Sequence, residues 1–159
     1  MNKDFRKTFS KYIENLPVEV KVLKYTNNGM TFSTKFKESY FTGEKGYLGE
    51  EETLDIELSE KGTKNQIAEF EHALKVNSFF PILMVKHFDP EAYEKGEDGF
   101  TTYKYFITRF TKRFIILERE DGSKMKISNG PHLKLFLAYA KDKGVVSTGE
   151  LNDFDLRVI

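Results

Sequence analysis

The chain has 159 residues, 39% of them apolar and 14% aromatic, and its 25 basic and 25 acidic side chains give a formal net charge of zero. This composition supports a packed core and excludes wholesale disorder, and no apolar run reaches the roughly 18 residues of a membrane-spanning helix. The absence of Cys excludes disulfides and thiolate metal sites, and residues 1–15 lack the apolar stretch of a signal peptide, so we expect a single cytoplasmic domain, bacterial or phage-encoded.

The charges are unevenly distributed. Residues 51–100 carry five basic and twelve acidic side chains, whereas residues 101–143 carry ten basic and four acidic ones. A neutral total removes the long-range attraction of a basic domain for nucleic acid, but a local basic face is still compatible with it. Residues 103–119 are the segment where such a face would lie, and the alternative is that the charges are scattered over a solvated surface.

The first half of the chain predicts a helix followed by a hairpin. Phe5, Phe9 and Tyr12 recur at helical spacing within residues 2–15, and Pro17 ends the pattern. Residues 18–25 then alternate Val with charged side chains, which is typical of a half-buried strand. A turn at residues 27–29 leads to a second alternating run over residues 30–37, so the two runs predict a β-hairpin.

The next segment predicts a strand and a second helix. Residues 38–52 are rich in Gly and Glu and suggest a loop or an irregular edge strand, and residues 54–59 alternate as a strand does. Thr63 is a candidate cap for a helix that ends near residues 77–78, with Ile67, Phe70 and Leu74 on its apolar face.

The second half of the chain predicts four strands and a helix. The strands are expected at residues 80–88, 101–111, 113–119 and 124–128, with a polar loop at 89–99 and a hairpin turn at 120–123. Pro131 would open the final helix, and Gly144 would end it.

These elements suggest an internal repeat. The two later helices align at a constant offset of 66 residues, which pairs Ile67 with Leu133, Phe70 with Phe136 and Leu74 with Ala140. We therefore predict an α+β fold of two β-β-β-β-α repeats packed as an intramolecular pseudo-dimer. An N-terminal helix would occupy residues 1–16, the repeats 17–78 and 79–143, and a tail or closing strand 144–159.

In this arrangement the chain resembles the Whirly and PUR-type single-strand-binding proteins, which are built from two such repeats. The resemblance covers residues 18–143 and concerns architecture alone. The Lys-Gly-Lys signature of plant Whirly proteins is absent, and residues 43–46 (Gly-Glu-Lys-Gly) are the nearest match. This architectural resemblance implies a protein that binds single-stranded DNA or RNA on exposed sheet faces.

The strand at residues 101–113 gives this hypothesis its candidate residues. We expect Phe106, Phe110 and Phe114 in the core, and Tyr103, Tyr105 and Arg109 on the exposed face, because a Tyr hydroxyl suits a wet surface. The predicted nucleic-acid-binding residues are Lys35, Lys37, Tyr40, Phe41, Tyr103, Tyr105, Arg109 and Arg113.

The tail at residues 150–156 mixes acidic and apolar side chains and is loosely similar to the acidic tips of bacterial single-strand-binding proteins. The alternation of Leu156 and Val158 favours a closing strand instead.

Two other functions stay open. The acidic segment at residues 50–60 could mimic a phosphate backbone and make the protein a phage-type inhibitor or adaptor of a host protein. Asp55 and Glu57 could hold a divalent ion, as in a small metal-dependent nuclease, although position 59 is Ser where such an enzyme would have Lys. His87 and Asp89 could form an acid–base or metal pair, but a boundary histidine is the favoured interpretation of His87. We predict a non-catalytic protein without cofactor, metal or membrane partner, able to form a homo-oligomer.

Overall fold

The structure is a computed structural model that describes residues 2–37, 47–59, 61–111, 113–128, 133–152 and 156–158. Its helices and its antiparallel and mixed sheets make the protein α+β, as the sequence predicts. The chain divides into two compact units, an N-terminal unit that ends at Pro81 and a C-terminal unit that begins at Ile82. Among the described residues, no helix has the length and apolar character needed to cross a membrane.

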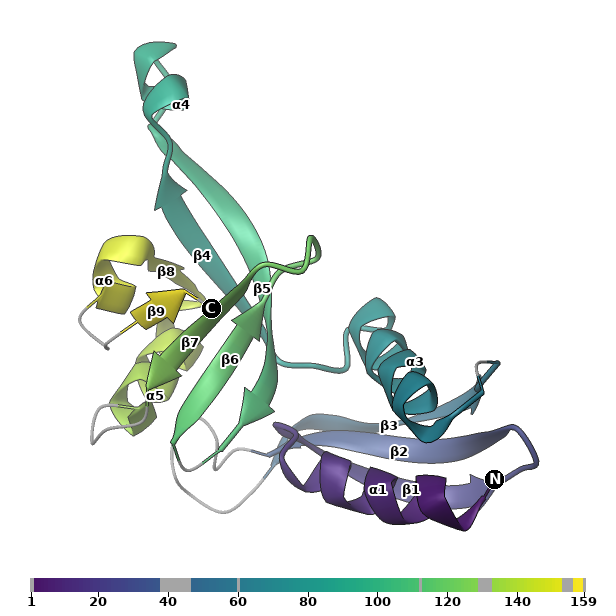
Figure 1. The fold of residues 1–159 in the computed structure, drawn as a ribbon. Coiled ribbons are helices and arrows are strands. Elements are labelled where there is room, and N and C mark those ends of the chain that lie inside the picture. Colours follow the sequence, from purple (N-terminus) through teal and green to yellow (C-terminus); the bar gives the residue numbers. More distant parts are fainter. Residues whose placement is uncertain are drawn as a thin grey trace. The chain divides into compact units, whose positions relative to one another are not determined.

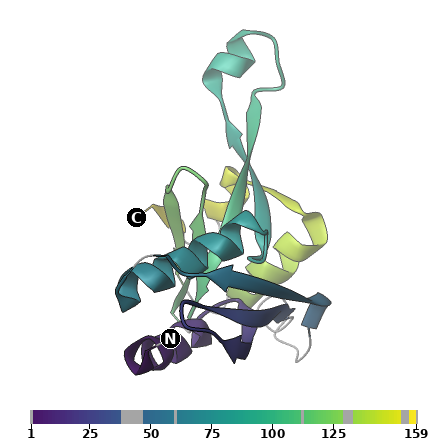
Figure 2. The same ribbon diagram turned by 90° about the vertical axis from the view of Figure 1, so that its right-hand side faces the viewer.

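The N-terminal unit is a three-stranded antiparallel sheet in the order β1-β2-β3, with two helices (Figures 1 and 2). The strands are β1 (Val18–Tyr25), β2 (Gly29–Lys37) and β3 (Tyr47–Glu57), and the helices are α1 (Lys3–Glu14) and α3 (Thr63–Val76). The Phe70 ring on α3 lies 4.7 Å from the Phe9 ring on α1 and 4.9 Å from the Phe32 ring on β2. These edge-to-face contacts place both helices on one face of the sheet.

Helix α1 forms where the sequence predicts it. The Asn2 side chain caps the helix by accepting a hydrogen bond from the Phe5 backbone N–H at 2.7 Å. Phe5 and Phe9 lie one turn apart and are both fully buried, whereas most of the helix's charged side chains are exposed. Because the two rings are one helical turn apart, they lie on the same side of α1 and pack the helix against the sheet.

The hairpin of β1 and β2 is confirmed, and its turn depends on Gly29. A Cβ at this position would lie 2.0 Å from the backbone oxygen of Ile56 on β3, so only glycine fits between the strands. The described part of the segment 38–52 belongs to β3 and is continuous with the predicted strand at 54–59. The first predicted repeat thus has three described strands where four were expected, and residues 38–46 lie outside the described residues.

Helix α3 begins one residue earlier than its predicted cap implies. Its N-cap is Gly62, which offers no side chain, and Thr63 is the first helical residue. The expected cap is wrong, but the apolar face is confirmed by the full burial of Phe70 and Leu74.

The C-terminal unit contains a six-stranded sheet in the order β8-β4-β5-β6-β7-β9. Strands β4 to β7 form an antiparallel meander, β8 pairs parallel with β4, and β9 pairs antiparallel with β7. The alternation of Leu156 and Val158 thus corresponds to a real strand. The strands are β4 (Ile82–Phe88), β5 (Phe100–Phe110), β6 (Phe114–Glu118), β7 (Lys124–Ser128), β8 (Val145–Ser147) and β9 (Leu156–Val158).

Helices α5 (Leu133–Lys143) and α6 (Thr148–Asn152) contribute to the core on one face of this sheet. Phe136 and Leu137 of α5 and Leu151 of α6 are buried in one cluster with alternate residues of the strands. The strand residues of this cluster are Leu83, Val85, Tyr105, Ile107, Ile115, Leu117, Ile127 and Val146. We call their side of the sheet the helix-covered face.

A short helix, α4 (Pro90–Glu94), lies within the segment predicted to be a polar loop. The Asp89 carboxylate accepts hydrogen bonds from the backbone N–H groups of Glu91 and Ala92, at 3.0 and 3.4 Å. Pro90 occupies the first helical position, where its missing N–H costs nothing. The loop prediction is therefore wrong, although Asp-Pro carried the signal for a helix start.

The two later helices share their burial pattern, since Phe70 and Phe136, and likewise Leu74 and Ala140, are buried. Their sheets differ, with three described strands in one unit and six in the other. The internal repeat, the pseudo-dimer and the single domain stay predictions.

Glu150 joins α5, β8 and α6. Its carboxylate accepts hydrogen bonds from the Tyr139 hydroxyl, the Ser147 backbone N–H at 2.8 Å and the Lys143 ammonium at 2.9 Å. These contacts, with the Tyr139 hydrogen bond contributing most, lower the pKa of Glu150 from 4.5 to about 2. The carboxylate therefore stabilises the folded state only while it is ionised.

We predict that Glu150→Gln removes an acid-sensitive part of the stability. Because the folded pKa is lowered, the contribution of Glu150 is fully present above pH 4.5 and is lost as the pH falls toward about 2. Urea unfolding at several pH values should show the gap between wild type and variant narrowing over this window. A gap that stays constant down to pH 2 would contradict the assignment.

Candidate nucleic-acid interface

The predicted site residues do not form one surface. Tyr40 and Phe41 lie outside the described residues. Lys35 and Lys37 lie on the outer face of β2 and are half-buried. Lys35 is opposite Glu19 on β1, so the outer face of this sheet mixes both charges.

Tyr105 is the clearest correction. Its side chain is fully buried in the core under α5, so it cannot stack on a base. Tyr103, two residues away on the same face, is 38% exposed because it lies beyond the core cluster. The expectation that a Tyr prefers the wet face is wrong here, because the hydroxyl of the buried Tyr105 has a hydrogen-bond partner at the edge of the core.

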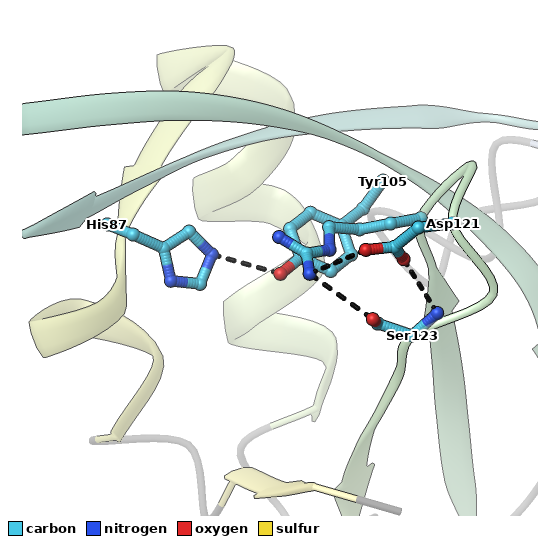
Figure 3. A network of polar contacts seen from close by, with 5 residues as sticks. His87, Tyr105, Asp121 and Ser123 are labelled. Atoms are coloured by element: carbon cyan, nitrogen blue, oxygen red, sulfur yellow. Dashed lines mark hydrogen bonds and ion pairs between the residues drawn. The ribbon is translucent and has the colours of Figure 1, made fainter. Parts of the chain in front are cut away.

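That partner is His87, whose Nε2 lies 2.9 Å from the Tyr105 hydroxyl (Figure 3). Burial, and secondarily the nearby Arg119 guanidinium, lowers the pKa of His87. Burial raises the pKa of Tyr105. Both groups are therefore neutral at neutral pH, and the pair offers no charge to a phosphate. His87 is a boundary histidine, as expected.

Arg119 connects this pair to the turn between β6 and β7. Its guanidinium donates to Asp121 at 2.9 Å and to Ser123 at 3.2 Å, and Asp121 also accepts from the Ser123 backbone N–H (Figure 3). It stacks over the Tyr103 ring at 4.6 Å. Its Nε is buried without a hydrogen-bond partner, so the cation–π contacts compensate its burial. This network orders the turn and is structural.

A β-bulge in β5 places other predicted residues on a different face of the sheet from the one expected. The register of β5 against β6 shifts between Ile107 and Arg109. The shift moves Arg109 to the face opposite Tyr105 and turns Phe110 toward the core beneath α5. The predicted grouping of Arg109 with the tyrosines is therefore wrong, as is that of Phe110 with Phe106 and Phe114. Arg113 is exposed in the connection to β6.

The opposite face of the C-terminal sheet is strongly basic. It is defined by the residues that alternate with the core positions on β4 to β7, and α5 and α6 pack on the other side. We call it the basic face, after its five cations Lys86, Lys104, Arg109, Lys124 and Lys126. Among the described strand side chains on this face, Glu118 is the one carboxylate, and it is buried. Of the predicted site residues on β5, Arg109 lies on this face, whereas Tyr103 and Tyr105 lie on the opposite one.

Aromatic rings lie beneath two of these cations. The Lys104 ammonium is 4.9 Å from the centre of the Phe106 ring, and the Lys126 ammonium is 4.1 Å from that of Phe114. Phe106 is only 3% exposed, whereas Phe114 is half-buried. The face thus offers many cations and little aromatic surface.

The acidic segment and the metal hypothesis concern the N-terminal unit. Glu51, Asp55 and Glu57 are exposed on β3, and Asp55 accepts a hydrogen bond from Thr31. Glu51 lines a shallow groove together with Glu19, Lys21 and Lys35 of the other two strands, so cations lie beside the acidic strip. Among the described residues, no three His, Asp or Glu side chains lie together as a metal site would need.

Comparison with protein-family models, curated proteins and solved structures finds no match for this chain. The resemblance to Whirly and PUR-type proteins therefore stays a prediction, and a functional assignment depends on the geometry above.

We predict that Tyr105→Phe and Tyr105→Ala separate the two contributions of this side chain. The Phe variant loses the hydrogen bond to His87 and should cost about 1 kcal/mol. The Ala variant also leaves a cavity under α5 and should cost about 3–5 kcal/mol. Urea unfolding measures both, with Tyr103→Ala on the exposed neighbour as the control. Equal losses for the two Ala variants would contradict the burial of Tyr105.

Proposed function

We propose that the protein binds single-stranded nucleic acid through the basic face. The observation that carries the proposal is the presence of five cations and one buried carboxylate on a sheet face that lies opposite α5 and α6. Phosphate neutralisation by Lys and Arg supplies most of the affinity of non-specific binding.

The cations are spread across the sheet in a way that fits a phosphate backbone. Lys86 lies on β4, Lys104 on β5, and Lys124 and Lys126 on β7. Since adjacent strands are about 4.8 Å apart, these positions span about 14 Å across the strands, the length of a few nucleotides. A single strand crossing the sheet would contact a cation on most strands it passes.

Apolar side chains between the cations favour a single strand over a duplex. Ile82 is exposed and Phe114 is half-buried on the same face, and both can contact the face of an unstacked base. A duplex keeps its base faces stacked inside and would gain only the phosphate contacts. Because Phe106 is buried, stacking contributes less than charge, and we expect strong salt dependence with weak sequence preference.

We predict that Lys104→Ala/Lys126→Ala weakens binding of a labelled 30-nucleotide strand and lowers its salt dependence. Each phosphate contact of a single strand contributes about 0.7 to the slope of log affinity against log salt, so losing two should reduce the slope by about 1.4. Fluorescence anisotropy between about 50 and 200 mM salt measures both quantities.

The matched control is Lys64→Ala/Lys134→Ala, which removes two exposed cations from α3 and α5. It should leave the slope unchanged, and an unlabelled duplex should compete about tenfold less well than the single strand. Absence of binding at low salt, or equal losses in both double variants, would refute the proposal.

A further inference from the structure

The β4–β5 hairpin extends beyond the rest of its sheet. Strand β5 pairs with β6 only from Phe106 onward, and β8 reaches β4 no further than Lys86. Past these positions, within the part of the chain that the structure describes, β4 and β5 pair only with each other, and they carry α4 at their far end (Figures 1 and 2). We call residues 88–100 the hairpin tip.

The tip presents aromatic rings that pack on one another. The Phe88 ring lies 6.0 Å from both the Tyr93 and the Phe100 rings. Gly99 has a φ of +81°, and a Cβ there would approach the Phe88 and Tyr93 side chains to 3.3 Å. The two rings therefore pack directly on the glycine backbone. The rings are thereby held in place without contact with the core cluster.

These rings are exposed to an unusual degree. Phe88, Tyr93 and Phe100 are 56%, 65% and 46% exposed. Contiguous exposed aromatics are typical of protein–protein contact sites, where such side chains supply most of the binding energy. The tip therefore has the features of one half of an interface.

The charge of the hairpin tip indicates which charge the surface that binds it must carry. Between Asp89 and Asp98 the chain has one cation, Lys95, and the carboxylates Asp89, Glu91, Glu94, Glu97 and Asp98. The complementary surface must be basic and must have exposed apolar side chains among its cations. The basic face meets both requirements, because Ile82 is 41% exposed on it and Val145, paired with Met84 at its margin, is 36% exposed.

We infer that the hairpin tip of one copy binds the basic face of a second copy. The tip cannot reach the basic face of its own chain, because it is the continuation of β4 and β5, two strands of that same sheet. A single contact uses the tip of one copy and the face of the other, so the pair that it joins still has one unoccupied tip and one unoccupied face. Further copies can bind at these two surfaces and give a chain or a ring, and a twofold dimer forms where two copies make both contacts reciprocally.

This inference goes beyond nucleic-acid binding, and its test contains no nucleic acid. The test uses two charge-reversal variants at exposed positions, Glu91→Lys/Glu94→Lys on the tip and Lys86→Glu/Lys124→Glu on the face. Sedimentation of the full chain at about 50 mM salt, where exposed charges still interact over more than 10 Å, measures the assembly. Circular dichroism establishes that each variant is folded.

We expect the wild type to form dimers or larger species, and each variant alone to be a monomer. An equimolar mixture should form dimers and nothing larger, because it combines one intact tip with one intact face. A monomeric wild type, variants that assemble as the wild type does, or a mixture that stays monomeric would each overturn the inference.

A second pair of variants tests how much the aromatic side chains of the tip contribute to assembly. Tyr93→Ser removes an exposed ring from the tip without changing its charge and should weaken assembly about tenfold or more. Leu135→Ser removes an equally exposed apolar side chain from α5, at 64%, and should leave assembly unchanged. Equal effects of the two substitutions would mean that the tip is not the contact.

Discussion

The packing of α5 on one side of the C-terminal sheet is the constraint on which the chemistry of this unit depends. Phe136 and Leu137 need an apolar surface, and the alternating strand residues beneath them supply it. Once that side is buried, the residues between must form the other face, and these include Lys86, Lys104, Arg109, Lys124 and Lys126. Tyr105 belongs to the buried set, where its hydroxyl has His87 as hydrogen-bond partner, and the Arg119 guanidinium lies over its ring.

The bulge in β5 determines how this separation of faces continues along the strand. Without it, Arg109 would point beneath α5, where a guanidinium would have to be buried among Ile107 and Ile115. The extra residue instead sends Arg109 to the side of Lys126 and brings Phe110 onto the core. One irregular position thus increases both the apolar content of one face and the positive charge of the other.

Much of the fold could be predicted from the sequence where a pattern is local. The spacing of Phe5 and Phe9, the turn before Gly29 and the alternation of Leu156 and Val158 all correspond to real elements. The candidate site was predicted less well, because alternation shows that β5 has two faces without showing which one a helix covers. That choice depends on where α5 packs, and a bulge leaves no signal in residue spacing. Asp89-Pro90 did carry a local signal for α4, whereas the pairing of β8 with β4 joins distant segments and had none.

Strands β8 and β9 complete the two opposite edges of the C-terminal sheet, although both follow α5 in the chain. During synthesis the meander of β4 to β7 therefore leaves the ribosome before either flanking strand exists. In that interval the backbone donors and acceptors of β4 and β7 are open to pairing with other nascent chains. Met84 on β4 can pair with Val145 on β8 only after residue 145 has been synthesised. The order of translation therefore makes the completion of this sheet a late folding event with a high contact order.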